Sequence, residues 1–152
     1  MKANFKEFLN KIDFDDPSEY DFDADKTIDQ NIKETLKNIN KSSWCWTLFS
    51  CEGHNHEDKS KSLPYFVFIV KKKSIPVLLG MLFNTLNPQV NVLTSFPLIN
   101  TNYISLSWGY TDDKYAIMNV HWSDLFLEDE KSHAKLLSDF YEMSFKILEA
   151  KL

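Results

Sequence analysis

The chain contains no arginine: all 17 basic residues are lysines, set against 22 acidic residues, and the formal net charge is -5. Arginine supplies the planar, fork-shaped donor that proteins use for bidentate contacts with phosphate and guanine. Non-specific binding of nucleic acid also needs a concentrated basic surface that replaces the counterions of the phosphates. We therefore expect nucleic acid to be an unfavoured partner.

Cysteine is scarce and long apolar runs are missing. Cys45 and Cys51, the two cysteines, lie six positions apart on one predicted strand, which is about 20 Å at about 3.3 Å per residue. Because a disulfide needs Cα atoms within about 7 Å, we expect free thiols and a reducing cytoplasm. No run approaches the roughly 20 apolar residues of a membrane span, and the first residues lack the apolar core of a secretory signal. The expected location is cytoplasmic, with no membrane partner.

The composition does provide for a substantial core. Hydrophobic residues make up 43% and aromatic residues 14% of the chain, which argues against overall disorder. A length of 152 residues fits one domain, so residues 1–152 are expected to form a single unit. One segment departs from this pattern, because residues 13–25 hold seven acidic residues and no lysine. We expect it to be irregular, either as a solvated loop or as an acidic decoy for a basic partner.

The spacing of apolar residues predicts an α+β domain. Its expected core is a mostly antiparallel sheet of about five strands, with two N-terminal helices, one buried central helix and a long C-terminal amphipathic helix. The helices are predicted near 5–12, over 28–41 with a capping box at Thr27 and Gln30, between Ser74 and Asn87, and over about 129–151. The strands are predicted at 44–50, 64–70, 89–95, 102–109 and 114–121.

The last two predicted strands have two different faces. On the first strand, Ile104, Leu106 and Trp108 point to one face. On the second strand, the even-numbered residues from Ala116 to Trp122 point to one face, and the odd-numbered residues from Tyr115 to His121 point to the other. One face is expected to belong to the core, while the other is half polar and aromatic. Tryptophan rings near His121 on that second face would offer stacking surfaces beside hydrogen-bond donors, as in a nucleotide-like ligand site.

One short stretch concentrates reactive side chains. Residues 50–58, SCEGHNHED, contain a thiol, two imidazoles, three carboxylates and one of the three glycines of the chain. Gly53 is expected to form a strand-ending turn, through a positive φ or through close approach of a ligand to the backbone. The candidate ligand-binding residues are those of this turn and two ring-bearing residues from later strands: Cys51, Glu52, Gly53, His54, His56, Asp58, Trp108 and His121.

Three kinds of chemistry stay open for this turn besides a plain polar loop. Cys51, His54 and His56 form a C-x-x-H-x-H array of residue types that zinc accepts, with Asp58 or His121 to complete four ligands. Cys51 beside His54 or His121 would also suit a thiol nucleophile, and hence an enzyme acting on a nucleotide or RNA. The third is a pocket that binds a polar ligand without converting it. The sequence requires no cofactor, and it leaves zinc binding open.

The stretch WTLFSCEGHNHED…PYFVFIV resembles a strand–S-C-x-G-H–strand element of small uncharacterised proteins from phages and their bacterial hosts, over about residues 44–70. More remotely, residues 50–53 look like the S-C-S-G turn of the wybutosine-synthesis methyltransferase family, which modifies tRNA. That family continues with arginine where this chain has His54. The phage-type resemblance implies a small cytosolic accessory protein that acts stoichiometrically, by sequestering a nucleotide-derived defence signal or by capping a host enzyme.

The leading functional expectation is therefore a non-enzymatic binding or inhibitor protein of the counter-defence or immunity-protein kind. Its ligand would be nucleotide-like and held near the turn from Cys51 to Asp58. A host defence protein is the alternative partner, for which the acidic segment 13–25 would supply complementary charge. The sequence leaves the identity of the ligand and the number of subunits open, including a homo-oligomer.

Overall fold

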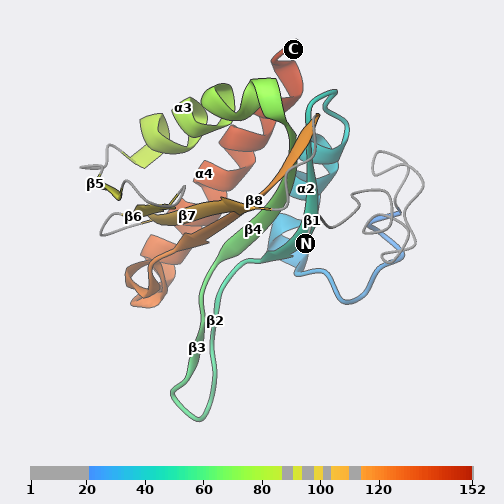
Figure 1. Ribbon diagram of the computed structural model, residues 1–152. Coiled ribbons are helices and arrows are strands. Elements are labelled where there is room, and N and C mark those ends of the chain that lie inside the picture. The colour runs from blue at the N-terminus through green and yellow to red at the C-terminus, as the bar shows by residue number, and fades with distance from the viewer. Residues whose placement is uncertain (1–20, 87–90, 94–97, 101–103, 110–113, 152) are drawn as a thin grey trace.

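The computed structural model describes residues 21–86, 91–93, 98–100, 104–109 and 114–151. Its main sheet has six strands in the order β1-β4-β8-β7-β6-β5, and all neighbouring strands are antiparallel (Figure 1). The expected α+β class with an antiparallel sheet is confirmed. The strands are β1 (Cys45–Cys51), β4 (Tyr65–Lys71), β5 (Asn91–Leu93), β6 (Leu98–Asn100), β7 (Ile104–Gly109) and β8 (Tyr115–Trp122).

The described part of the sheet has one strand more than expected. Within the strand expected at 89–95, the structure describes the three residues of β5, and the short strand β6 lies between β5 and β7. The four longer strands match their predicted positions closely. Their apolar residues either alternate or run without interruption, and such patterns identify a strand without help from its neighbours.

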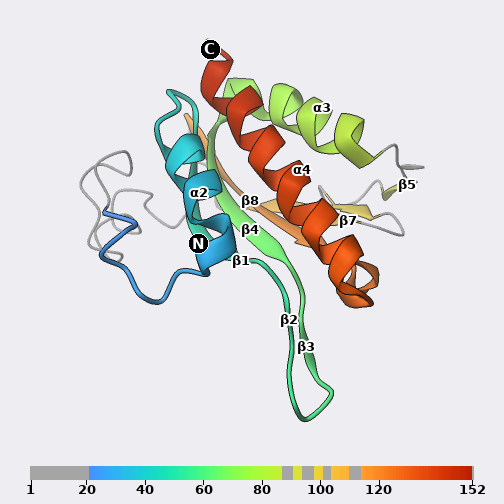
Figure 2. The same cartoon turned by 180° about the vertical axis from the view of Figure 1, so that it is seen from behind.

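Three α-helices cover one face of the sheet. In Figure 2, α2 and α4 lie side by side in front of the strands, and α3 lies along the upper end. In the core beneath them, Phe140 of α4 packs edge-on against Phe66 of β4 and Trp122 of β8, with ring centroids 4.9 and 4.6 Å apart. The helices are α2 (Lys33–Asn40), α3 (Ile75–Leu86) and α4 (Glu130–Glu149). The helix expected near 5–12 lies outside the described residues.

The beginning of α2 differs from the expected capping box. The chain first makes a 3-10 turn, η2 (Gln30–Ile32), whose N-cap residue is Asp29 and not Thr27. The backbone N–H and the hydroxyl of Thr27 both donate to one oxygen of Asp25, at 2.9 and 2.6 Å. This local turn competes with capping, so the helix begins later than the sequence pattern predicted.

The central helix α3 is less buried than its apolar sequence predicted. Leu78 and Leu82 are fully buried in the core, but Pro76 and Gly80 are exposed and Val77 is half-buried. The expected burial of this helix is therefore met on the side that faces the core, where Ile75, Leu79 and Met81 also pack against it. The reason is the position of α3 at the end of the sheet, where it contacts the core along one side.

The second face of the sheet, which we call the open face, carries no described helix. Strand register places Cys51, Tyr65, His121 and Ser105 in one row across β1, β4, β8 and β7 on this face. A second row, nearer the other end of β4, begins with Trp46 and Ile69. The expected half-polar, aromatic face is thus present, and Trp108 is not part of it. Trp108 pairs with Met118 and packs with the core on the helix-covered face.

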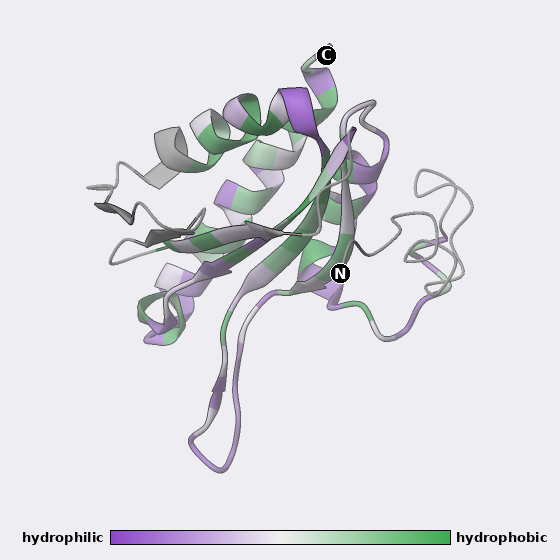
Figure 3. Cartoon of the chain, viewed as in Figure 1, coloured by the Kyte–Doolittle hydropathy of each residue, from purple (hydrophilic) through white to green (hydrophobic). Residues whose placement is uncertain are grey.

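The stretch after β1 is a long arm and not a simple turn between two strands. Strands β2 (His54–Asn55) and β3 (Lys61–Ser62) pair with each other, and the chain reverses between them. At the reversal Lys59 has a φ of 67°. The arm extends beyond the main sheet in Figure 1, and Figure 3 shows that its residues are mostly hydrophilic. The motif SCEGHNHED therefore forms the root and the first half of this arm.

Candidate functional site

Gly53 sets the path of the chain at the root of the arm. Its φ of +89° lies in the left-handed region that favours glycine. A Cβ atom at this position would lie 2.7 Å from Pro64 Cγ and 2.8 Å from Leu127 Cδ2, which is too close for real contacts. Glycine is therefore required here by both conformation and space. The resulting bend brings residues 51 and 54 onto the same side of the chain.

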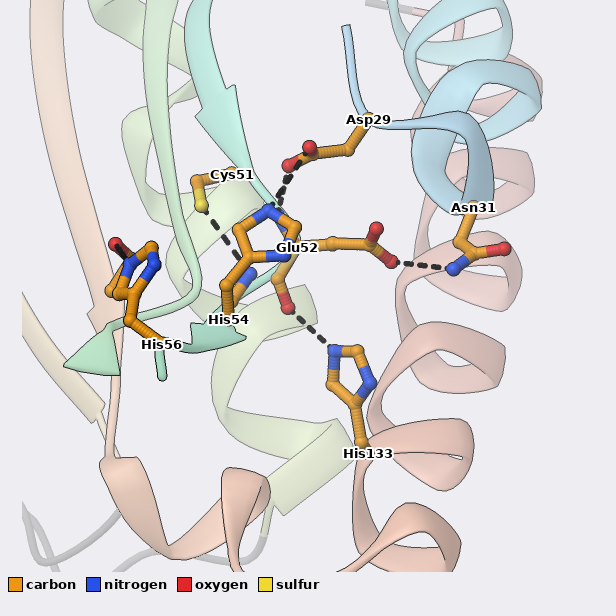
Figure 4. Close-up of polar contacts among 9 residues, drawn as sticks. Asp29, Asn31, Cys51, Glu52, His54, His56 and His133 are labelled. Atoms are coloured by element: carbon orange, nitrogen blue, oxygen red, sulfur yellow. Dashed lines mark hydrogen bonds and ion pairs between the residues drawn. The ribbon is translucent and has the colours of Figure 1, made fainter. Parts of the chain in front are cut away.

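Asp29 joins the η2 turn to the root of the arm (Figure 4). One oxygen of its carboxylate accepts the backbone N–H of Glu52 at 2.9 Å, and the other lies 3.0 Å from Nε2 of His54. The Sγ atom of Cys51 accepts the backbone N–H of Gly53 at 3.4 Å. One potential ligand atom from each of Asp29, Cys51 and His54 lies within 4.8 Å of the others. The structure thus brings two of the predicted residues together with one that the local motif does not contain.

Glu52 has a structural role. Its side chain is buried and turns toward the helices, where Asn31 Nδ2 donates to Oε2 at 2.8 Å. Its backbone carbonyl lies 2.7 Å from Nε2 of His133 on α4. These contacts fix the root of the arm against η2 and α4. Glu52 therefore supports the Asp29–Cys51–His54 cluster from behind and does not face it.

His56 and Asp58 lie further along the arm. Nε2 of His56 is 2.7 Å from the hydroxyl of Ser62, and its ring centroid is 6.4 Å from that of His54. Asp58 accepts the backbone N–H and the hydroxyl of Ser60, and hydrogen bonds from Ser60 lower the pKa of the Asp58 carboxyl. The C-x-x-H-x-H array is thus divided, with His54 in the cluster and His56 outside it.

His121 lies on the open face, two strands away from Cys51. Its ring is 5.5 Å from that of Tyr65, whose backbone pairs with both His121 and Cys51. Two strand spacings separate His121 from Cys51 by about 10 Å, so it is not a direct partner of the thiol. Burial lowers the pKa of the His121 imidazole.

The surroundings of Cys51 favour a neutral thiol. Partial burial raises the pKa of the Cys51 thiol, the backbone hydrogen bond from Gly53 opposes this, and the charge of Asp29 raises it further. A nucleophilic cysteine needs the opposite, an environment that stabilises the thiolate. The surroundings of Cys51 therefore lack the thiolate stabilisation on which a cysteine nucleophile depends.

A hollow of about 340 Å³ lies beside this cluster along the edge strand β1. The β-bulge between Thr47 and Phe49 leaves the Phe49 side chain 50% exposed at its rim. Its walls combine apolar side chains with polar groups, namely a carboxylate and four hydroxyls. The residues that line it are Phe22, Asp25, Thr27, Ile28, Leu36, Thr47, Leu48, Phe49, Ser50 and Tyr65.

A second hollow, at the opposite end of β4, is basic. It has a volume of about 310 Å³ and is lined by Lys71, Lys72, Lys73, Lys114 and Tyr115. Two chain segments form it, because β4 and β8 pair at Lys71 and Tyr115, and the N–H of Lys72 donates to the carbonyl of Lys114 at 2.7 Å. Figure 3 shows the hydrophilic segment where β4 passes into α3. We refer to this feature as the lysine hollow.

Tyr115 connects the lysine hollow to the aromatic part of the open face. Its ring centroid lies 6.1 Å from that of Trp46, with the two planes tilted by 55°. Both side chains are half-buried. This site was not among the candidates predicted from the sequence, although the run Lys71-Lys72-Lys73 indicates a basic surface. The fourth lysine, Lys114, directly precedes β8, and its position in the hollow depends on the pairing of β4 with β8.

Comparison with protein-family models, with curated proteins and with solved structures finds no match for this chain. Among the described residues, no helix combines the length and the apolar character needed to cross a bilayer.

Proposed function

We propose that the protein binds a small phosphate-bearing, nucleotide-like ligand in the lysine hollow and acts by sequestering it. The observation that carries this proposal is the gathering of four lysines around Tyr115 in a chain whose net charge is -5. Lysine binds phosphate as a point charge and does not need the bidentate geometry of arginine. The absence of arginine is therefore compatible with this ligand class.

Charge also argues against the earlier expectation that such a ligand binds at the arm. Asp29 lies at the root of the arm, and Glu57 and Asp58 lie further along it, followed by Lys59 and Lys61. The hollow along β1 has Asp25 in its wall. A phosphate group near these carboxylates would meet like charge, whereas the described lining of the lysine hollow contains no carboxylate. We therefore propose the lysine hollow as the ligand site, in place of the turn from Cys51 to Asp58.

Trp46 and Tyr115 would bind the base of such a ligand. Stacking of a nucleic-acid base on an aromatic side chain is worth about 1–3 kcal/mol and tolerates different bases. Lysines beside these rings would hold the phosphates at the same time. This arrangement has the composition of a nucleotide-binding site, in which a few polar groups fix the orientation of a ligand held by apolar contact.

The chemistry of the lysine hollow supports binding without turnover. Its described lining consists of lysine and tyrosine side chains only. None of these is a carboxylate or imidazole of the kind that usually acts as a general base. In the phage-type setting that the sequence resembles, such a protein would remove a nucleotide-derived signal from solution in proportion to its own amount.

Equilibrium binding tests this proposal with ATP, ADP-ribose and 3′,5′-cyclic nucleotides as probes. The double variant K72E/K73E should weaken binding of the best probe by at least about tenfold, since two favourable charges become repulsive. The matched control K61E/K131E makes the same change of net charge at exposed positions in the arm and at the start of α4, away from the hollow, and it should change affinity by less than about twofold. The bound probe should be recovered intact after heat denaturation.

Three outcomes would overturn the proposal. The first is that the wild-type protein binds none of the probes. The second is that the control variant loses as much affinity as the double variant, which would indicate non-specific attraction. The third is recovery of a chemically altered ligand, which would indicate an enzyme.

A further inference from the structure

Three potential metal ligands converge at the root of the arm from separate positions in the chain. Asp29 precedes η2, Cys51 ends β1, and His54 begins β2. Their ligand atoms all lie within 4.8 Å of one another. In a tetrahedral zinc site, bonds of about 2.0–2.3 Å place neighbouring ligand atoms about 3.3–3.8 Å apart. Small side-chain rotations are therefore enough to close the cluster around an ion.

The ligand types favour zinc over other common cations. Calcium and magnesium prefer sites made only of oxygen atoms. A thiolate, an imidazole and a carboxylate together suit the borderline softness of zinc. A cation would also relieve the close approach of the Asp29 carboxylate to a thiolate at Cys51.

The cluster is held in position by contacts outside it. The second oxygen of Asp29 accepts the N–H of Glu52 at 2.9 Å, which leaves the first oxygen directed at His54. The carbonyl of Glu52 is in turn held by His133 at 2.7 Å. Gly53 supplies the bend that lets residues 51 and 54 face the same point. Such outer contacts orient metal ligands in known sites and contribute to metal affinity.

We propose that Asp29, Cys51 and His54 bind one zinc ion and leave its fourth position open. The open position follows from the number of ligands, since three protein ligands and one exchangeable ligand are typical of non-structural zinc sites. All three residues are half-buried, so an ion can reach them from solvent. This site is independent of the lysine hollow, which lies at the other end of β4.

His56 provides a matched control, because the sequence motif and the structure differ on it. The C-x-x-H-x-H array includes His56 among the ligands, whereas the structure places it against Ser62, with Asp29 in the cluster instead. Separate substitution of His54 and His56 therefore distinguishes the ligand set of the sequence motif from the ligand set of the structure. Cys51→Ser is the second test variant, because the hydroxyl of serine can still accept the N–H of Gly53 that the sulfur accepts, so the fold should survive the change.

The experiment uses the purified full chain, without nucleotide, loaded with Zn²⁺ or with Co²⁺ as a spectroscopic substitute. We expect one zinc per chain by elemental analysis and a thiolate-to-cobalt charge-transfer band that is absent in C51S. D29N and H54Q should weaken zinc affinity by at least about tenfold, and H56Q by less than about twofold. Circular dichroism of each metal-free variant shows whether it is folded.

Each alternative result overturns the proposal. Substoichiometric zinc in the wild-type protein would mean that Asp29 and His54 form only an ion pair. An equal loss of zinc affinity in H56Q and H54Q would show that His56 is a ligand, as the sequence motif predicts. Retention of the charge-transfer band in C51S would exclude the Cys51 sulfur as a ligand.

Discussion

The carboxylate of Asp29 lies 3.0 Å from Nε2 of His54, although 25 residues separate them in the sequence. The same carboxylate accepts the N–H of Glu52 at 2.9 Å. Asp29 thereby fastens the segment before α2 to the root of the arm. Its position has consequences for stability that can be measured apart from any ligand.

Replacement of Asp29 by alanine should destabilise the fold. The change leaves the Glu52 N–H without its acceptor, and hydrogen bonds to charged groups contribute about 1.5–3 kcal/mol. We expect the free energy of unfolding in urea to fall by about that amount, and D29N, which keeps an acceptor oxygen, to fall less. Equal stability of D29A and the wild type would show that the contact is not formed in solution.

Two glycines give opposite predictions for the same substitution. Gly53→Ala should cost about 2 kcal/mol or more, because the Cβ atom would collide with Pro64 and Leu127 at a positive φ. Gly80→Ala should stabilise the protein by about 0.5–1 kcal/mol, since Gly80 is an exposed position in α3 with nothing within 4 Å of the added atom. Thermal unfolding of both variants against wild type tests the pair, and a stable Gly53→Ala protein would contradict the path described for the arm.

The two thiols should differ in their reaction with iodoacetamide. Cys45 is fully buried in β1, whereas Cys51 is half-buried on the open face. We expect mass spectrometry to find native protein modified at Cys51 alone, and Cys45 to react only after denaturation. Bound zinc should protect Cys51. Modification of Cys45 in the folded protein would contradict its placement in the core.

His121 should make stability depend on pH. The side chain of His121 is partly exposed, and its partial burial lowers the pKa below the 6.5 of an unperturbed histidine. The unfolded chain therefore binds a proton at a higher pH than the folded chain does. As pH falls from 6.5 toward the lower folded value, the free energy of unfolding should decrease. His121→Gln should remove this part of the pH dependence, measured as the difference in melting temperature between the two proteins from pH 8 to pH 5.5. An NMR midpoint for His121 at or above 6.5 would contradict the prediction.

The regular elements were predictable from local sequence because their signals are periodic. The helix-covered residues of β7 and β8 alternate as expected, and α4 has apolar residues at helical spacing from Leu136 to Leu148. The beginning of α2 was not predictable in this way. Thr27 forms a turn with Asp25, and the carboxylate of Asp29 is engaged in contacts with residues more than 20 positions away.

The candidate site was predictable only in part, because contacts between residues distant in the sequence complete it. Cys51 and His54 belong to one motif, but Asp29 joins them through tertiary contact, and no pattern within residues 50–58 indicates it. The lysine hollow likewise depends on the pairing of Lys71 with Tyr115, which places Lys114 beside the lysine run. Residue types identify candidate chemistry, whereas strand pairing decides which candidates meet.

The positions of these two clusters at opposite ends of β4 give the molecule an electrical polarity. The Asp29 carboxylate lies at the end where β4 begins with Tyr65, and four lysines line the hollow near Lys71, where β4 ends. An approaching anion is repelled at the first end and attracted at the second, so it is oriented before it makes contact. Under the two proposals made above, anions would bind at one end of β4 and cations at the other.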